Sequence, residues 1–501
     1  MLKRLMTVGL AALGLLIAPV AANAAAPDEA VLRDIDGIVE QWRIGANVPG
    51  LVYGIVIDGQ LAVVRGQGVQ ELDSKRPVTP DSLFRIASMS KAFTALAILK
   101  LADEGKLSLD APAETYVPEM RGWTYPTGDS RRIRVRDLLN HTAGFVTDDP
   151  WGDRQQPLPE AAFTRMLKAG VPFSRPPGMA MEYSNFGYAL LGRIISNVSG
   201  KRYQDYIRDS VMAPLGMAST GYDVSTSPAD RRALGYRWQD AGWVREPDMA
   251  DGVFGAMGGV QTSANDYARW VAFLLSAWPA RDGAETGPVS RSTVRGIVEG
   301  SNFPSGGMRP TLADGTPCRA ARAYGMGWTV ISDCELGRAL QHGGGYPGYG
   351  SNVMLLPDKG IGIFILTNRT YAGPSSAVWK IALTLQQTGA FPDRQPVTSK
   401  GVAAGYDIAL AVWAAGSVSG SKDGLAMNFL MDRDEAHRAG ELARLKAEVG
   451  DCPASEPVTA VTAMQGTFTW TCAKGRIEGV LLLAPTPSPA LQALDFRVQA
   501  P

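Results

Sequence analysis

Histidine is scarce in this chain of 501 residues, which contains only His141, His342 and His437. None of them is spaced from a cysteine in the manner of a zinc site, so the sequence predicts neither a metal site nor a cofactor. A Ser-His-Asp triad would have to use one of these three side chains. The chain also lacks a G-x-S-x-G segment, and this absence argues against the nucleophile elbow of an α/β-hydrolase.

Neither sign of charge is in excess, since 49 basic side chains balance 49 acidic ones. A balanced charge argues against binding of nucleic acid or of an anionic membrane by bulk electrostatics. The sequence gives no indication of an oligomeric state.

Long apolar runs are absent except at the N-terminus. Lys3 and Arg4 precede an apolar stretch over residues 5–20, and Ala22-Asn23-Ala24 follows it. This order is typical of a signal peptide with an A-x-A cleavage site, and the stretch is short for a membrane span. We expect residues 1–24 to be removed and the mature chain to work in the periplasm or outside the cell, with no membrane span.

Cysteine occurs four times, as Cys318, Cys334, Cys452 and Cys472. In an exported protein an even count suggests disulfides, and four cysteines allow three pairings. The pairing of sequence neighbours, Cys318 with Cys334 and Cys452 with Cys472, is the most economical. Each bridge would contribute about 3 kcal/mol by closing a loop of roughly 15–20 residues. Free buried thiols are the alternative.

A serine and a lysine stand three residues apart in Ser88-Met89-Ser90-Lys91, directly before the apolar run 92–99. Residues i and i+3 share one helix face, so the amine is expected beside the hydroxyl. A serine next to a desolvated amine is a nucleophile with its own proton acceptor, at a helix start that favours an oxyanion. The alternative is an N-cap serine. The same spacing recurs in Ser419-Gly420-Ser421-Lys422, but within a Gly/Ser-rich stretch.

Two further segments carry groups that suit such a nucleophile. In Tyr183-Ser184-Asn185, a phenol near a lysine would have a lowered pKa and could carry a proton, while the amide could orient a substrate carbonyl and contact Lys91. In His342-Gly343-Gly344-Gly345, residues without side chains would let a substrate lie against the end of a strand. The alternatives are an ordinary buried tyrosine and a glycine-rich turn.

The order of secondary structure predicts the architecture. The pattern is strand, helix, a mostly helical stretch over 106–290, then strands and a helix, which indicates an α/β (α+β) fold with one sheet flanked by helices and a helical subdomain inserted in the middle. A site is expected in the crevice between them. Helices are expected over 28–45, 88–105, 186–198, 266–276 and 374–388, and strands over 50–57, 61–69, 324–331, 339–343, 351–356 and 360–367.

The character of the chain changes after about residue 390. Residues 391–396 resemble a linker because they contain two prolines. Beyond it, we expect a small α+β module over residues 400–501, with helices over 402–415 and 433–449 and short strands over 457–483. Prolines at 485, 487 and 489 should break the last stretch. Nothing in this module looks catalytic, and its role is open.

Taken in order, the three motifs resemble those of penicillin-recognising serine hydrolases. The chain looks similar to the branch that holds class C β-lactamases, D-aminopeptidases, D-Ala-D-Ala carboxypeptidases and related esterases. The resemblance covers roughly residues 30–390 and implies an antiparallel sheet of the β-lactamase/transpeptidase kind, in a hydrolase domain over residues 25–392. Further matching segments are 83–87, 138–144, 214–217, 258–263 and 327–328.

The resemblance implies a role for each motif residue. Ser88 would attack a carbonyl and become acylated, with Lys91 and Tyr183 sharing the proton transfer and the choice of base left open. Asn185 would position the substrate along the Gly344 strand. The N–H groups of Ser88 and Gly345 would form the oxyanion hole, and His141 would be a framework residue.

One departure from the family concerns His342, which stands where the family's K-T-G motif has lysine. Histidine is mostly neutral near pH 7, so strong binding of a β-lactam carboxylate is not expected. Histidine variants of this motif resemble the peptidase and esterase branches. The expected function is an exported serine hydrolase acting on esters, amides or small peptides, D-amino-acid-containing ones included. A β-lactamase is one alternative, and a non-catalytic protein that binds cell-wall peptides or penicillin is another.

Overall fold

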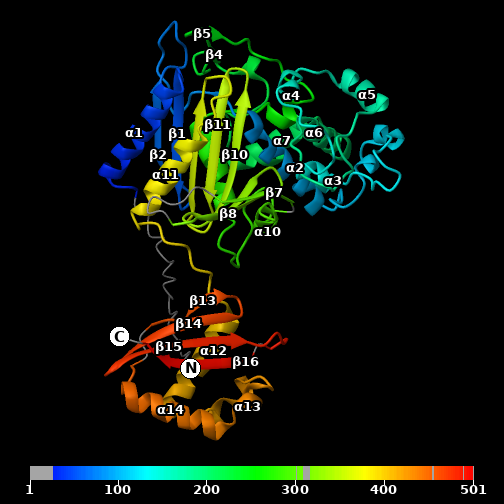
Figure 1. Cartoon of the computed structure of the whole chain (residues 1–501). Helices are drawn as coiled ribbons and strands as arrows, with labels where there is room; N and C mark the ends of the chain where they lie inside the picture. The colour runs from blue at the N-terminus through cyan, green and yellow to red at the C-terminus, as the bar shows by residue number, and fades with distance from the viewer. Residues whose placement is uncertain (1–25, 301, 309–315, 454–455, 489, 500–501) are drawn as a thin grey trace, which may run out of the picture.

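The computed structural model describes residues 26–300, 302–308, 316–453, 456–488 and 490–499 (Figure 1). The signal peptide expected over residues 1–24 lies outside these. Among the described residues, no helix has both the length and the apolar character needed to cross a membrane.

An eight-stranded sheet forms the centre of the larger region, and every neighbouring pair in it is antiparallel. The hairpin that opens it turns at Asp58 and Gly59, whose φ angles of 49° and 80° suit a tight two-residue turn. In spatial order the strands are β2 (Gln60–Gly68), β1 (Gly50–Ile57), β12 (Ile361–Thr367), β11 (Tyr349–Leu356), β10 (Gly337–Tyr346), β9 (Thr329–Asp333), β8 (Arg319–Tyr324) and β7 (Asn302–Met308).

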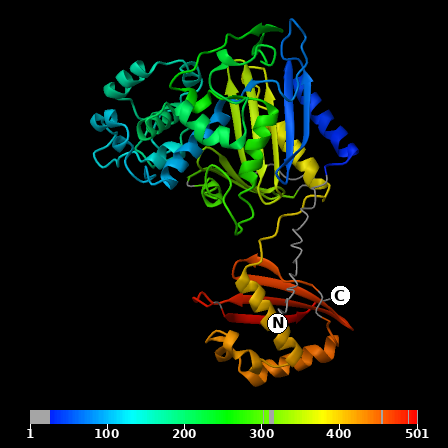
Figure 2. The same ribbon diagram turned by 180° about the vertical axis from the view of Figure 1, so that it is seen from behind.

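Helices cover both faces of this sheet, so its central strands β1, β11 and β12 are buried along their whole length. On one face, α1 (Glu29–Gly45) packs beside α11 (Ser375–Gln387), and α1 turns Leu32, Ile35 and Val39 toward the sheet at helical spacing. On the other face lie α2 (Lys91–Asp103) and α9 (Ala264–Leu275). Figure 2 turns this face of the sheet toward the viewer. The antiparallel sheet flanked by helices is confirmed.

The helical subdomain stands beside the second layer, as expected. Its longest helix, α6 (Asn185–Ser199), packs on α2 and ends at Gly200, which adopts the left-handed conformation with φ 71°. The shorter helices are α3 (Val135–Leu139), α4 (Trp151–Arg154), α5 (Glu160–Ala169), α7 (Tyr203–Ile207), α8 (Gly255–Gly258) and α10 (Arg291–Gly296). Two small sheets consist of two strands each: β3 (Phe84–Arg85) pairs with β6 (Gln261–Thr262), and β4 (Tyr236–Gln239) pairs with β5 (Gly242–Arg245).

The C-terminal module builds its own sheet and core. Strands β13 to β16 pair in sequence order, and alternate residues of β14 and β15 are buried against α12 and α14. Figures 1 and 2 show the module apart from the larger sheet, joined to it through residues 388–399. Its elements are α12 (Lys400–Ala415), α13 (Phe429–Asp432), α14 (Glu435–Val449), β13 (Thr459–Thr462), β14 (Gln465–Cys472), β15 (Gly475–Leu483) and β16 (Leu491–Val498).

Two expectations about strands were wrong, and one strand was missed. The strand expected over 324–331 is two strands, β8 and β9, because Gly325 to Trp328 turn the chain and Gly327 has φ 78°. The strand expected to end at 343 runs on to Tyr346, since its glycines still pair with β11. The expected break at the prolines is present, since β15 ends at Leu483 and bends follow it, but the strand β16 that forms beyond them was not expected.

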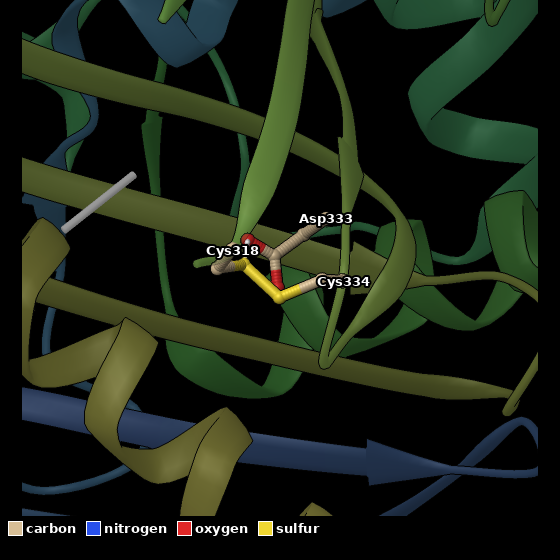
Figure 3. A group of neighbouring side chains, drawn as sticks. All are labelled: Cys318, Asp333 and Cys334. Atoms are coloured by element: carbon tan, nitrogen blue, oxygen red, sulfur yellow. Dashed lines mark hydrogen bonds between the residues drawn. A yellow bond between two sulfur atoms is a disulfide. The ribbon is translucent and has the colours of Figure 1, made fainter. Parts of the chain in front are cut away.

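Both disulfides join sequence neighbours, so the expected pairing of Cys318 with Cys334 and of Cys452 with Cys472 is confirmed. The first links the residue before β8 to the residue after β9. Figure 3 shows the Asp333 carboxylate beside it, 3.9 Å from the Cys318 sulfur. Because the two sulfurs are bonded to each other, they offer no thiolate to a metal here. The carboxylate accepts the N–H groups of Glu335 and Leu336 at the turn that follows.

Candidate active site

The nucleophile candidate Ser88 lies inside a 3-10 turn, Ala87–Ser90, that leads directly into α2 at Lys91. The N-cap of α2 is Ser90, so the alternative in which Ser88 caps this helix is wrong. Ala87 has φ 49°, an uncommon left-handed conformation for a residue with a side chain, and such local strain is typical of functional sites. The turn places the Lys91 amine 3.0 Å from the Ser88 hydroxyl, as the spacing predicted.

Lys91 is fully buried, which is rare for a lysine, and its amine donates to three oxygens. They are Ser88 Oγ at 3.0 Å, Asn185 Oδ1 at 2.7 Å and the Met257 carbonyl at 3.0 Å. Burial lowers the pKa of Lys91 to about 8, against the opposing effect of nearby aspartates. An amine with a pKa near the ambient pH can give up its proton and take one back during a reaction.

Tyr183 behaves differently from the sequence-based expectation of a lowered pKa. Burial raises the pKa of its phenol well above 10, and the charge of Asp149 acts in the same direction, whereas a hydrogen bond with Ser88 acts against them. The Lys91 amine lies over the face of the ring, 4.8 Å from its centre. The phenol is therefore neutral and able to donate a proton. The expected lowering failed because the motif revealed the neighbouring charge but not the burial.

Asn185 begins α6 and is fully buried between Lys91 and a group of aspartates. Its Oδ1 accepts from Lys91, and its Nδ2 donates to Asp149 in a short hydrogen bond. Asp148 accepts the backbone N–H groups of Asn185 at 2.7 Å and of Phe186 at 2.8 Å, and so binds the free donors at the start of α6. The expected contact between Asn185 and Lys91 is present, and both ends of the amide are fixed.

His342 lies in β10 and is 6% exposed. Its Nδ1 lies 2.6 Å from the Gly343 carbonyl, which only accepts, so Nδ1 carries the proton and Nε2 accepts the Tyr324 hydroxyl at 2.8 Å. Burial lowers the pKa of His342 to about 4, and the charge of Lys91 adds to the effect. The ring is thus neutral at pH 7 and offers no positive charge to a substrate carboxylate.

The glycines after His342 lie along the second half of β10. Strand β9 pairs with β10 only from Gly337 to Gln341, whereas β11 pairs with β10 through Tyr346. Among the described residues, no strand covers this edge. Gly344 has a second reason to lack a side chain, because a Cβ there would lie 2.3 Å from the Ile86 carbonyl oxygen. The missing side chain lets the strand approach the turn that carries Ser88.

The structure therefore gathers the expected site residues in one place: Ser88, Lys91, Tyr183 and Asn185 are linked by contacts, and Gly344 lies against the nucleophile turn. His342 stands near them, its ring centre 6.3 Å from that of Tyr183.

His141 packs its ring 4.3 Å from Tyr183, centre to centre. Its Nδ1 accepts the Ser184 N–H at 3.2 Å, so the ring holds in place the backbone of the motif that carries Tyr183 and Asn185.

Sequence reasoning missed several residues of the site. Asp149 and Asp148 hold Asn185, the buried Asp153 adds a third carboxylate, and Tyr324 holds His342. Burial raises the pKa of Asp153 to about 6, helped by the charge of Asp149. A signal was present in the sequence, since three aspartates fall within six residues at 148–153. Nothing in the sequence alone connects them to Lys91.

Comparison with known proteins gives consistent relatives. Protein flp of Staphylococcus aureus (strain N315) is 30% identical over 343 residues, which are 67% of this chain and 63% of flp. The chain thus matches less than two thirds of the length of flp. The D-alanyl-D-alanine-carboxypeptidase/endopeptidase AmpH of Escherichia coli (strain K12) is 27% identical over 341 residues, which are 67% of this chain and 83% of AmpH.

Solved structures share the fold. The octameric penicillin-binding protein homologue from Pyrococcus abyssi aligns with a TM-score of 0.56 and 20% identity, over 93% of this chain and 100% of its own. A mutant class C beta-lactamase aligns with a TM-score of 0.56 and 20% identity, over 72% of this chain and 97% of its own. A family model described as Beta-lactamase matches residues 34–388. Because that match covers well over half of the 501 residues, the chain belongs to the beta-lactamase family.

Proposed function

We propose that this protein is an exported serine hydrolase that forms an acyl-enzyme on Ser88, with Lys91 as the base. The observation that carries the proposal is the buried Lys91 amine, which lies 3.0 Å from the Ser88 hydroxyl and has its pKa lowered to about 8. A lysine held this way is largely ready to accept the hydroxyl proton at mildly alkaline pH.

The proposed reaction has two halves. As Ser88 Oγ attacks the substrate carbonyl, its proton moves to the Lys91 amine, and the developing oxyanion is held by the N–H groups of Ser88 and Gly345. The Tyr183 phenol, which is neutral, then passes a proton from Lys91 to the departing alcohol or amine, and the acyl group stays on Ser88. In the second half, Lys91 takes a proton from water, the water attacks the acyl carbon, and Ser88 recovers its proton.

The charges around the site favour substrates without a carboxylate close to the reacting carbonyl. His342 is neutral, with its pKa lowered to about 4, and Asp148, Asp149 and Asp153 all act on the charge of Lys91. We therefore propose esters, amides or small peptides as substrates. AmpH, a D-alanyl-D-alanine-carboxypeptidase/endopeptidase, supports peptides that contain D-residues, and the charges of this site favour those cleaved away from the C-terminal carboxylate. A β-lactamase is the second candidate, supported by the fold shared with a class C beta-lactamase.

Two further parts of the proposal concern the whole chain. The two disulfides support an oxidising compartment, in agreement with export to the periplasm or beyond. The separate core of the C-terminal module supports a division into a hydrolase domain over residues 25–392 and an accessory module over residues 400–501.

A fluorophosphonate probe tests the proposed nucleophile. The parent protein should be labelled, Ser88→Ala should not, and Ser419→Ala, which removes the serine of the second S-x-x-K segment, should be labelled like the parent. An unlabelled parent protein would favour the non-catalytic binding protein. If labelling occurs, turnover of a p-nitrophenyl ester, a D-aminoacyl anilide and a chromogenic cephalosporin ranks the substrate classes. Fast cephalosporin turnover without esterase activity would make the β-lactamase the better assignment.

A further inference from the structure

Tyr371 lies in the loop between β12 and α11 and is held there in an unusual conformation. Its φ is 52°, in the left-handed region that a tyrosine rarely adopts. Its backbone N–H donates to the Tyr349 carbonyl at 3.1 Å, and the Tyr346 carbonyl lies 3.4 Å away. Both carbonyls belong to the β10–β11 hairpin. A strained residue persists only where its surroundings determine it, and strain of this kind clusters at functional sites.

The Tyr371 ring lies against Gly345, on the half of β10 that β9 leaves uncovered. A Cβ on Gly345 would be 2.7 Å from Cδ1 of Tyr371, so the glycine is needed for the ring to sit where it does. Neighbouring strand residues point to opposite faces. Since Gly344 faces the turn that carries Ser88, Gly345 and the ring lie on the other face of the sheet.

The Tyr371 hydroxyl nevertheless reaches the helical subdomain. It donates to Asp153 Oδ2 at 2.9 Å, and this aspartate in α4 is 2% exposed although the tyrosine is 43% exposed. The side chain must therefore pass around the free edge of β10 just beyond Gly345. Figure 1 shows α4 beside the end of the sheet where β10 and β11 meet.

The segment that carries Asp153 is tied to the site at several points. Asp149 bonds the side chain of Asn185, and Gln156 accepts the Tyr346 hydroxyl at 2.7 Å. Two tyrosine bonds thus join this segment to the sheet region: an inner one from the β10–β11 hairpin to the fully buried Gln156, and an outer one from the half-exposed Tyr371, in the loop after β12, to Asp153. Loss of the outer bond can therefore change the space beside Gly345, while the inner bond still holds the helical subdomain against β10.

We propose that Tyr371, held by Asp153, determines substrate specificity by blocking the unpaired edge of β10 next to Gly345. The inference rests on the proposed function, because it assumes a substrate whose carbonyl lies between Ser88 and Gly345. A substituent that extends along β10 past Gly345 meets the tyrosine side chain. The site accepts a small substituent in that direction and excludes a bulky one.

Three variants test this role. Tyr371→Gly removes the ring and thereby frees the edge of β10 beside Gly345. Glycine adopts the positive φ of this position without backbone strain. Tyr371→Phe keeps the ring and loses the bond, and Asp153→Asn weakens the same bond from the other side. The matched controls are Tyr53→Phe and Asp36→Asn, because Tyr53 in β1 donates to Asp36 in α1 at 2.5 Å, on the face of the sheet away from Ser88.

The measurement is the ratio of kcat/KM for a bulky over a small substrate. Two series of esters are compared, one varying the acyl group and one varying the alcohol, so that either side of the carbonyl is probed. Tyr371→Gly should raise the ratio at least about tenfold in one series, which corresponds to about 1.4 kcal/mol. Tyr371→Phe and Asp153→Asn should raise it by a smaller and similar factor, and neither control should change it.

The outcomes separate this proposal from the proposed function. Ratios that stay at the parent value in both series, for variants that melt at the parent temperature and still label at Ser88, would overturn the role of Tyr371 alone. A parent protein that does not label would overturn the hydrolase proposal instead. If Tyr371→Gly fails to fold, Tyr371→Asn tests the same opening, since asparagine tolerates positive φ.

Discussion

Two segments of this chain share the S-x-x-K spacing, and both place the serine in a 3-10 turn. At Ser88 the lysine is fully buried and donates to the serine hydroxyl. At Ser419 both side chains are exposed: the serine bonds Glu435, and Lys422 forms an ion pair with the same carboxylate group at 3.0 Å. Spacing alone therefore does not make a nucleophile. The difference is the protein around the pair, which removes water from one amine and leaves the other in solvent.

The comparison extends to the regions that carry the two segments. Around Lys91, helices α2 and α6 and the turn before α2 exclude water, and Asn185 fixes the amine. Around Lys422, the module offers a short exposed turn next to α14. Desolvation is the largest cause of the lowered pKa of Lys91. Burial, which a motif search does not see, thus lowers the pKa of Lys91 into the range that the proposed base requires.

The strongest test of this difference removes each lysine in turn. Lys91→Met keeps the length of the side chain without its amine, and we expect kcat for a p-nitrophenyl ester to fall by at least about a thousandfold, within the range for loss of a general base. Lys422→Met should leave kcat within about twofold of the parent, in the range of an exposed substitution. More than a tenth of the activity remaining in Lys91→Met would contradict the role of this amine.

The pH dependence of kcat/KM tests which group is the base. A base must be unprotonated to act, so activity should rise with pH and level off above about 8, the value to which burial lowers the pKa of Lys91. Two pH units below, it should be lower by about a hundredfold, since each unit below the pKa leaves about ten times less of the amine unprotonated. Tyr183→Phe should lower the plateau and keep its midpoint.

The opposite result would point to the phenol. Burial raises the pKa of Tyr183 well above 10, so a reaction that used its phenolate as base would go on accelerating far beyond pH 8. A profile of that kind in the parent protein, lost in Tyr183→Phe, would assign the base to Tyr183.

Much of the site could be predicted from the sequence, because its parts are local. Ser88 and Lys91 are one helical turn apart, and Asn185 follows Tyr183 by two residues, so each pair is set by its own segment. The aspartates at 148–153 and Tyr371 could not be assigned. Their roles depend on contacts between distant segments: Asp148 and Asp149 bind Asn185 across 37 and 36 positions, and Asp153 accepts from Tyr371, 218 positions away.

The fold shows the same division between local and distant information. Amphipathic helices such as α1 and the hairpin at Asp58-Gly59 were predicted, since periodicity and turn residues specify them. The second half of β10 was not, because three consecutive glycines have a low strand propensity. Pairing with β11 overrides that propensity, and the close approach of β10 to the turn of Ser88 requires a glycine at position 344.

The smallest effect on catalysis is expected from the module. The double variant Cys452→Ser/Cys472→Ser should lower the free energy of unfolding of the module by about 3 kcal/mol, measured by hydrogen exchange in urea. It should leave kcat/KM within about twofold, in the range of a substitution remote from the site. The module has its own core, and every site residue assigned here lies between Ser88 and Tyr371.

The matched variant Cys318→Ser/Cys334→Ser opens a loop of similar length in the other region. It should cost a similar free energy, but it releases the open end of the β8–β9 hairpin, and the other end of β8 carries Tyr324, which holds His342. We therefore expect it to lower kcat/KM severalfold, which the module variant does not. Equal losses of kcat/KM in the two variants would mean that the module contributes to the site after all. The two regions would then differ only in how deeply they bury their S-x-x-K lysines.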